Sequence, residues 1–261
     1  MNASSANDAM TTGYLRFFRI AGHSINSYKV LLCVGIYVGT LATAALASSS
    51  GLSPLRLGLV GMTSAVAGLF GARVYFLLVR APQYLKRRSL AAVWDTSDGG
   101  WSLFGGLLPL IAVSYAAVPW LGISLPVLLD HLAFGVLAGG FWVRLGCVFN
   151  GCCAGREAHG ALCVHLHDTQ GIIKPRIPVQ FLEMAWWLVG IVGFCMLWPR
   201  LLPAGSYALA VMAWYGTGRF FLEPLRESPD TVFGRVRINQ LVAAVLVVAA
   251  GTALIIRGWG A

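Results

Sequence analysis

The stretch KVLLCVGIYVGTLATAALA, residues 29–47, decides the fold class of this chain, because its only charged residue is the first one. A helix needs about 20 mainly apolar residues to cross the hydrocarbon core of a bilayer. Backbone polar groups cannot stay unsatisfied in lipid, so a run of this kind is expected to be helical. Comparable runs follow at about residues 57–79, 103–120, 125–142, 178–198, 204–222 and 237–256. The pattern predicts an all-α, polytopic membrane protein with about seven transmembrane helices.

The composition of the whole chain agrees with this prediction. Of its 261 residues, 57% are apolar and 11% are charged, and the mean hydropathy is +0.73. Soluble domains contain roughly 25% charged residues. The first run ends at 45–47 in the letters ALA, which are similar to a signal-peptidase site, but the polar segment before the run is longer than the leader of a cleaved signal. We expect one integral-membrane domain over residues 1–261, with a polar, amphipathic segment at 1–28 and a polar loop at 143–177.

The charged residues indicate a membrane surface rather than nucleic acid. The chain has 19 Lys and Arg against 10 Asp and Glu, a net charge of +9, but the basic residues are scattered at helix ends and in loops. The one cluster is Lys86-Arg87-Arg88, and anionic lipid is a sufficient partner for such charges.

The distribution of basic residues also predicts an orientation in the membrane. If the spans alternate in direction, most Lys and Arg lie on the side of the amino terminus. The positive-inside rule then places that side in the cytoplasm.

Ionisable residues at membrane depth are costly and therefore indicate function. The sixth run ends in WYGTGRFFLEPLR, residues 214–226, where helical spacing stacks four polar residues on one face: Tyr215, Arg219, Glu223 and Arg226. This stripe has two interpretations, an Arg219–Glu223 ion pair that only joins helices, or part of a ligand site. The acidic residues are too few to neutralise the arginines, so an anion is a plausible ligand, and arginine binds phosphate bidentately.

A second polar stretch, RLGCVFNGCCAGRE at residues 144–157, combines arginines with glycines. Gly146, Gly151 and Gly155 allow a sharp turn or a close backbone approach, and their N–H groups can point at an anion. An arginine-flanked glycine loop at a helix end indicates a phospholipid headgroup site. The alternative is an ordinary loop whose arginines reach the membrane surface. We expect the helices to enclose a polar, lipid-binding cavity lined by Arg73, Arg144, Arg219 and Glu223.

Five short motifs occur between about residues 70 and 230. They are GARVYF with Arg73, SLFGGL with Gly105 and Gly106, VRLGCVFNGCCAGR with Arg144, Gly146, Asn150, Gly151, Gly155 and Arg156, PVQFLE with Pro178, Gln180 and Glu183, and YGTGRFFLEPLR with Tyr215, Arg219, Glu223 and Arg226. In this order they resemble the motifs of the prolipoprotein diacylglyceryl transferase family.

The resemblance implies a seven-helix enzyme of the bacterial plasma (inner) membrane whose active site opens towards the outer leaflet. It would transfer the diacylglyceryl group of phosphatidylglycerol to the cysteine thiol of a prolipoprotein lipobox and release glycerol phosphate, without a cofactor. Cationic groups would hold the lipid phosphate and stabilise the leaving group. The resemblance gives catalytic roles to Arg144, Tyr215, Arg219 and Glu223. It gives substrate-binding roles to Arg73, Gly105, Gly106, Gly146, Asn150, Gly151, Gly155, Arg156, Gln180, Glu183 and Arg226.

The chain departs from the family pattern at three positions. Phe104 stands where the family has a histidine favoured as the base, and phenylalanine cannot accept a proton. Cys147 replaces an asparagine of the signature, and Cys152 replaces its acidic residue. Proton removal from the attacking thiol would then fall to Glu223, Tyr215 or solvent. The family topology also places this face outside the cytoplasm, against the charge count, and we follow the family.

The cysteines support a different class of function, a membrane metal-binding or thiol redox protein. Thiolates and imidazoles are good ligands for zinc, copper(I) or iron, and the candidates are Cys147, Cys152, Cys153, His159, Cys163, His165 and His167. In CVHLHD, strand alternation would put the cysteine and both histidines on one face. The spacing matches no tight metal motif, however, and adjacent cysteines do not easily ligate one tetrahedral ion. The sequence therefore predicts no metal site.

Overall fold

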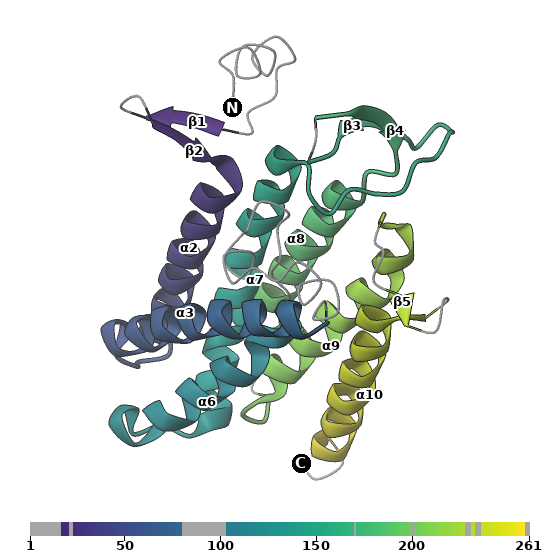
Figure 1. Ribbon diagram of the computed structural model, residues 1–261. Helices are drawn as coiled ribbons and strands as arrows, with labels where there is room; N and C mark the ends of the chain where they lie inside the picture. Colours follow the sequence, from purple (N-terminus) through teal and green to yellow (C-terminus); the bar gives the residue numbers. More distant parts are fainter. Residues whose placement is uncertain are drawn as a thin grey trace.

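The computed structural model describes residues 17–20, 23–79, 103–169, 171–198, 200, 202–227, 231–232 and 236–258. Every apolar run found in the sequence forms a long helix (Figure 1): α2 (Ser27–Ser49), α3 (Pro54–Val79), α6 (Leu103–Leu121), α7 (Leu125–Asn150), α8 (Val179–Leu197), α9 (Ser206–Leu222) and α10 (Ile238–Gly258). Six of these helices are long and apolar enough to span a membrane, and α9 is shorter at 17 residues. The prediction of an all-α, multi-pass membrane protein is confirmed. The basic cluster at 86–88 lies outside the described residues.

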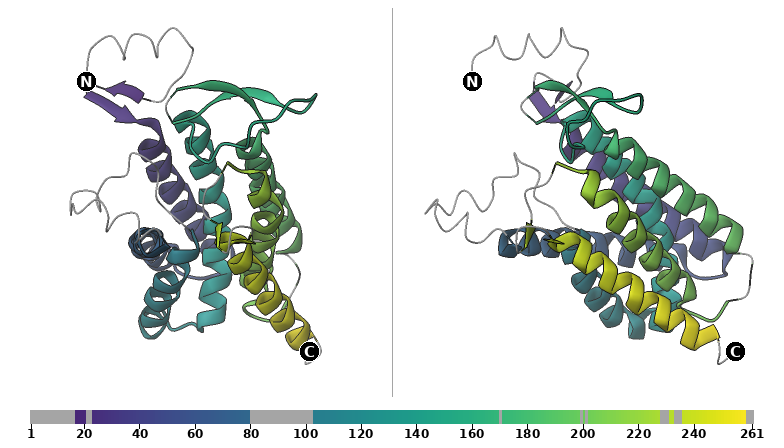
Figure 2. Two further views of the ribbon diagram at one scale, coloured as in Figure 1. Left: turned by 45° about the vertical axis from the view of Figure 1, so that its right-hand side comes forward. Right: turned by 90° about the vertical axis from the view of Figure 1, so that its right-hand side faces the viewer.

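The remaining described elements are short: β1 (Phe17–Ile20), β2 (His23–Asn26), β3 (Val164–His167), β4 (Ile173–Arg176), the 3₁₀ turn η1 (Glu223–Leu225), β5 (Thr231–Val232) and β6 (Val236–Arg237). Consecutive strands pair antiparallel. The β1–β2 and β3–β4 hairpins lie at the same end of the bundle in both views of Figure 2, and the C-terminal end of α10 lies at the opposite end. This arrangement is the one expected when successive helices alternate in direction.

The signature stretch is only partly a loop. Helix α7 continues through Asn150, eight residues beyond the end of the predicted span, because its last turns remain helical until Gly151 adopts a left-handed φ of +69°. Glycine takes this conformation without the Cβ penalty that other residues meet, and it commonly ends helices. The polar loop expected at 143–177 therefore begins at Gly151. Residues 151–178, called the signature loop below, carry the β3–β4 hairpin.

Helices α2 and α7 cross in contact through glycines that the sequence analysis did not single out. An added Cβ on Gly35 would lie 2.7 Å from the carbonyl oxygen of Gly139, and one on Gly39 would lie 2.6 Å from that of Gly135. Small residues four apart on both helices let the backbones approach closely, which is how membrane helices gain packing energy. This crossing fixes α7, and with it Arg144, relative to α2.

A pair of tryptophans sets the register between α8 and α9. The rings of Trp186 and Trp214 stack with centroids 3.9 Å apart. Each indole N–H also donates to the other residue's carbonyl oxygen, at 3.0 and 3.1 Å. Buried indole N–H groups need a partner, and the reciprocal pairing satisfies both at once. The register brings Glu183 of α8 opposite Arg219 of α9.

Asp130 of α7 holds the other end of α9. Its carboxylate accepts hydrogen bonds from the backbone N–H groups of Gly205, at 2.6 Å, and Ala208, at 2.8 Å. The first N–H groups of a helix lack partners within the helix, and a negative charge there is also stabilised by the positive end of the helix dipole. Asp130 thus caps α9 from a neighbouring helix and ties α7 to α9 at the end opposite the hairpins.

The α2–α7 crossing can be tested with a matched pair of glycine substitutions. Gly39→Ala is expected to lower the free energy of unfolding in detergent by about 1–3 kcal/mol, because the methyl group would overlap the Gly135 carbonyl. Gly193→Ala on α8 is the control, since no described atom lies within 4 Å of an added Cβ there. The control is expected to be neutral or slightly stabilising. Equal thermal stability of the two variants would contradict the tight crossing.

Candidate functional site

A cavity of about 940 Å³ opens between the helices and the signature loop. This volume is at the upper end of the roughly 300–1,000 Å³ of ligand pockets. Much of its lining is apolar, for example Leu107 and Ile111 of α6 and Val136 of α7. The polar and thiol side chains that line it near the hairpin end include Arg144, Cys147, Cys152, Cys153, Tyr215, Arg219, Glu223 and Arg226, together with Tyr28, Asp168, Glu227 and Asn239. The cavity thus combines a charged end with an apolar surface.

Glu183 of α8 joins three arginines from different segments. Its Oε2 lies 3.0 Å from Nη1 of Arg144 on α7, and its Oε1 lies 2.9 Å from Nη1 of Arg219 on α9. Arg226, which follows η1, is 3.7 Å from the same Oε1. The Glu183 side chain is only 4% exposed. A carboxylate with so little access to water needs these partners to remain charged.

Glu223 is the second carboxylate of the site. Its Oε2 lies 2.6 Å from Nη2 of Arg219 and 3.6 Å from Nη1 of Arg226. Its Oε1 accepts a hydrogen bond from Asn239 of α10 at 3.0 Å. The guanidinium of Arg237 also donates to the backbone carbonyls of Glu223 and Arg226. The end of α9 and the turn η1 are therefore joined to β6 and to the start of α10 at this point.

We call Arg144, Glu183, Arg219, Glu223 and Arg226 the ion-pair network. Three arginines and two glutamates leave a net charge of +1 (three minus two) within it. The two interpretations of the Arg219–Glu223 spacing are therefore compatible, since the pair joins helices and also lines the cavity. Guanidinium groups bind oxyanions with bidentate hydrogen bonds. The network can accept one singly charged anion without a further counter-ion.

The arginines differ in how strongly the glutamates hold them. Arg219 makes two close contacts with carboxylates, at 2.9 and 2.6 Å. Arg226 makes only long contacts, at 3.7 and 3.6 Å, which are beyond hydrogen-bond distance. Arg144 has one close carboxylate. Arg226 and Arg144 are consequently the side chains best able to bind an incoming anion, while Arg219 is mainly engaged inside the network.

Two other arginines named from the motifs are not among the residues that line this cavity. Arg73 is buried on α3, with its guanidinium 5.4 Å from the ring centroid of Phe76, and is not among the residues found to line the cavity. The Arg156 side chain is exposed, and the backbone of this residue bonds with Leu225 and Ile177. Arg73 lies next to the lining residue Phe76 without lining the cavity itself, and its expected role in substrate binding stays a prediction.

Arg176 of β4 is the arginine that sequence reasoning missed. It is 1% exposed and donates to the carbonyl oxygen of Gly155 at 3.2 Å. Its guanidinium also pairs with Asp168 and Glu227. It connects the hairpin to the chain after η1 and so holds the signature loop over the cavity. Arg176 is the last residue of a four-residue strand, and the sequence pattern around it did not predict that its side chain is buried.

The glycines of the motifs have packing roles that need no ligand. A Cβ on Gly105 would lie 2.3 Å from Cβ of Tyr75, and one on Gly106 would lie 2.9 Å from the Gly68 carbonyl oxygen. These contacts bring α6 against α3. In the signature, a Cβ would lie 3.2 Å from Leu31 at Gly146, 2.5 Å from the Asp168 carbonyl at Gly151 and 2.0 Å from the Ile177 carbonyl at Gly155.

The amides of the motifs also hold the framework of the site. Asn150 Oδ1 accepts a hydrogen bond from Asn26 Nδ2 at 3.0 Å, which joins the end of α7 to the start of α2. Gln180 Nε2 donates to the Cys152 carbonyl oxygen at 3.0 Å, which joins α8 to the signature loop. Both amides are buried. Their contacts place Cys152 and its neighbours, and their expected roles in substrate binding stay predictions.

Phe104 lies at the start of α6 on the cavity wall. It is 9% exposed, and its ring meets that of Tyr215 edge to face with centroids 5.6 Å apart. Both residues line the cavity. The position that a basic side chain would need is therefore occupied by an apolar ring, which cannot take a proton from a thiol.

The cysteines are arranged differently from the expectation. The Sγ atoms of Cys147, Cys152 and Cys153 all lie within 4.8 Å of one another. The sequence analysis expected that adjacent cysteines do not easily ligate one ion, but here the three thiols converge, because Cys153 adopts a left-handed φ of 59° three residues after the end of α7. No other potential metal-binding group was found in the part of the chain that the structure describes.

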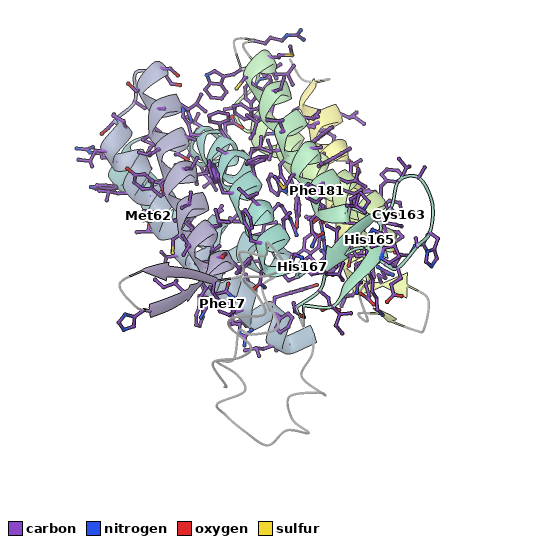
Figure 3. The ribbon with its side chains drawn as sticks, turned by 90° about the horizontal axis from the view of Figure 1, so that it is seen from above. Phe17, Met62, Cys163, His165, His167 and Phe181 are labelled. Carbon is purple, nitrogen blue, oxygen red and sulfur yellow. The ribbon has the colours of Figure 1, made fainter. Side chains whose placement is uncertain are left out.

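The hairpin residues CVHLHD do not join this cluster. The labels of His167, His165 and Cys163 in Figure 3 run from the middle of the molecule towards one side, following the hairpin outwards. His159 and His165 are exposed. Among the described residues, the expected face of Cys163, His165 and His167 forms no ligand group. The six cysteines are all free thiols.

The helices and the charged cavity define a class, a multi-pass membrane protein with a cationic site at the wall of an apolar cavity. The sequence model described as prolipoprotein diacylglyceryl transferase matches residues 16–257. The chain therefore belongs to the prolipoprotein diacylglyceryl transferase family. This finding confirms the resemblance seen in the five motifs.

Curated relatives agree along most of the chain. A phosphatidylglycerol–prolipoprotein diacylglyceryl transferase of Staphylococcus epidermidis is 26% identical, covering 91% of this chain and 88% of its own length. One of Geobacillus kaustophilus is 28% identical and covers 93% of both chains. One of Streptococcus mutans is 28% identical over 72% of this chain and 74% of its own.

The ion-pair network predicts a strong dependence of stability on Glu183. Glu183→Gln is expected to lower the free energy of unfolding by about 3–5 kcal/mol, because arginines in contact with it would lose a buried counter-charge. Glu157→Gln is the matched control: the hydrogen bond from Lys174 lowers the pKa of the Glu157 carboxyl, but the pair is exposed. Unfolding in detergent should be unchanged in the control. Equal stability of both variants would show that the network is not structural.

Proposed function

We propose that this protein transfers the diacylglyceryl group of phosphatidylglycerol to the cysteine thiol of a prolipoprotein lipobox in the bacterial plasma membrane. Membership of the family supports this proposal, as do relatives named for this activity. The observation that carries it is the net positive ion-pair network on the wall of a largely apolar cavity. Transfer of a labelled diacylglyceryl group from phosphatidylglycerol to a lipobox peptide by the purified protein is the direct test.

The cavity suits a phospholipid in two respects. The phosphodiester of phosphatidylglycerol carries one negative charge, which balances the +1 of the network. Arg226 and Arg144 would bind the phosphate oxygens, because the glutamates hold them less tightly than Arg219. The apolar lining, including Leu107 and Ile111, would contact the glyceryl ester region and the acyl chains.

The reaction forms a carbon–sulfur bond. The thiolate of the lipobox cysteine attacks the glyceryl carbon that carries the phosphate, the carbon–oxygen bond breaks, and glycerol phosphate leaves with the electron pair. Negative charge then grows on the phosphate of the leaving group. Arginines already in position stabilise this charge without reorganisation, which is the largest contribution in many enzymes. Arg144, Arg219 and Arg226 would supply this stabilisation.

The lipobox cysteine has to lose its thiol proton before it can attack the lipid. A thiol with a pKa near 8.5 is mostly protonated at neutral pH. The Glu223 carboxylate is already paired with Arg219 and bonded to Asn239, so it is a weak base. Phe104 cannot accept a proton, and Tyr215 packs against it. A group other than these has to favour the thiolate if the reaction is to be fast.

The proposed phosphate contact can be tested by comparing two arginines of the motifs. Arg226→Gln is expected to weaken phosphatidylglycerol binding and transfer about 10- to 100-fold, as for the loss of hydrogen bonds to a charged group. Arg156→Gln is expected to cost less than about fivefold, because its side chain is exposed. Lipid affinity and initial rates would be measured on both. Similar losses in the two variants would place the phosphate elsewhere.

The proposal includes an orientation in which the signature loop faces the outside of the cell, as the family resemblance implies and against the positive-inside count. Leu162→Cys in the signature loop should react with an impermeant thiol reagent in intact cells, since Leu162 is 85% exposed. Leu202→Cys between α8 and α9 should react only after lysis. Both changes would be made in a Cys163→Ser chain. The reverse pattern would support the charge count and contradict this topology.

A further inference from the structure

The three cysteines of the signature lie at the charged end of the proposed substrate cavity. Cys147 is in the last turn of α7, and Cys152 and Cys153 follow the left-handed Gly151. Cys147 and Cys152 are 3% and 7% exposed, and all three line the cavity. We call these residues the cysteine cluster. The lipid site described above uses none of them.

The geometry of the cysteine cluster suits a thiophilic metal ion. A zinc ion with sulfur ligands at about 2.3 Å in tetrahedral geometry needs those sulfurs about 3.8 Å apart. The Sγ atoms lie within 4.8 Å of one another, so small rotamer changes would bring them to this separation. Three protein ligands and one open position are typical of catalytic zinc sites, whereas structural sites usually have four.

The surrounding charges favour such an ion. Three thiolates and one Zn²⁺ carry a net charge of −1 (two minus three). Arg144 Nη1 lies 4.0 Å from Cys147 Sγ, and Arg226 lines the same cavity as Cys153. Buried charge is tolerated when it is paired in this way. Arg144 and Arg226 would therefore face both the metal–thiolate group and the lipid phosphate, and the +1 of the ion-pair network balances only one of these two groups.

We propose that Cys147, Cys152 and Cys153 bind one Zn²⁺, and that its open fourth position takes the acceptor cysteine of the prolipoprotein as a thiolate. This inference rests on the proposed transferase function. Zn²⁺ removes the proton from a coordinating thiol outright. The ion would thus replace the base that is missing at Phe104, and the sequence expectation of no metal would be wrong.

The proposed step is balanced. The three cysteines release their protons to water when they bind Zn²⁺, and the acceptor thiol releases its proton when it coordinates. The acceptor sulfur then uses one lone pair to form the carbon–sulfur bond while the glyceryl carbon–oxygen bond breaks onto the phosphate. The thioether product is neutral and is a weaker ligand than a thiolate, so it leaves the ion. Zn²⁺ is neither oxidised nor reduced.

The first test is the metal content of the full chain, purified in detergent with reductant and supplied with Zn²⁺. We expect about one zinc per chain. Cys152→Ser and Cys147→Ser should each bind substantially less, whereas Cys163→Ser, on the hairpin, should bind as the parent chain does. Thermal unfolding shows whether each variant is folded. A parent chain without zinc, or equal zinc in all the variants, would overturn the proposal.

The second test follows the open position without measuring transfer. Co²⁺ in place of Zn²⁺ gives visible absorption bands that depend on its ligands. A lipobox peptide should shift these bands, and the same peptide with serine in place of its cysteine should not. Identical spectra with the two peptides would overturn the role of the fourth position. Binding of copper(I) alone, with no response to Zn²⁺ or Co²⁺, would overturn the assignment of the ion.

The activity assay separates this inference from the proposed function. Chelator-treated protein should transfer the diacylglyceryl group about 10²- to 10⁴-fold more slowly, the usual contribution of a base, and Zn²⁺ should restore the rate. Full activity of metal-free protein would overturn the zinc site and leave the transferase function intact. A zinc-bound protein that responds to the cysteine peptide but transfers nothing from phosphatidylglycerol would instead contradict the proposed function.

Discussion

The contact on which the site depends is that of Glu183 with its arginines. Isolated guanidinium groups are costly inside a membrane protein, and they are retained where carboxylates and ligands compensate them. Glu183 gathers Arg144, Arg219 and Arg226 from separate segments of the chain. These contacts hold the three arginines together at the edge of the cavity.

The apolar packing around the network serves the same geometry. The glycine crossing of α2 and α7 places Arg144, and the stacked Trp186 and Trp214 align α8 with α9. Asp130 fixes the far end of α9 through its capping hydrogen bonds. These contacts lie away from the polar site, yet each one determines where a charged side chain can reach. Charge placement in this protein is therefore a result of close helix packing.

The differences from the family pattern fall in one place. By the family resemblance, Phe104 stands where a histidine is expected, and Cys147 and Cys152 stand where an asparagine and an acidic residue are expected. Phe104, Cys147 and Cys152 all line the same cavity. Loss of a proton acceptor and gain of converging thiols within one site are chemically related changes, since a metal–thiolate centre offers another way to hold a sulfur nucleophile as its anion.

Residue patterns along the chain were sufficient to predict the fold class and most of the ion-pair network. Apolar runs long enough to span a bilayer can be satisfied only as helices, and helical spacing already placed Arg219, Glu223 and Arg226 on one side. However, the periodicity of apolar and polar residues describes one helix at a time and does not predict which residues of two helices contact each other. The packing of Gly35 and Gly39, the burial of Arg176 and the exposure of Arg156 depended on neighbours distant in sequence. Only the tertiary structure could bring Cys147 to the adjacent pair Cys152 and Cys153, because a left-handed turn after α7 reverses the chain between them.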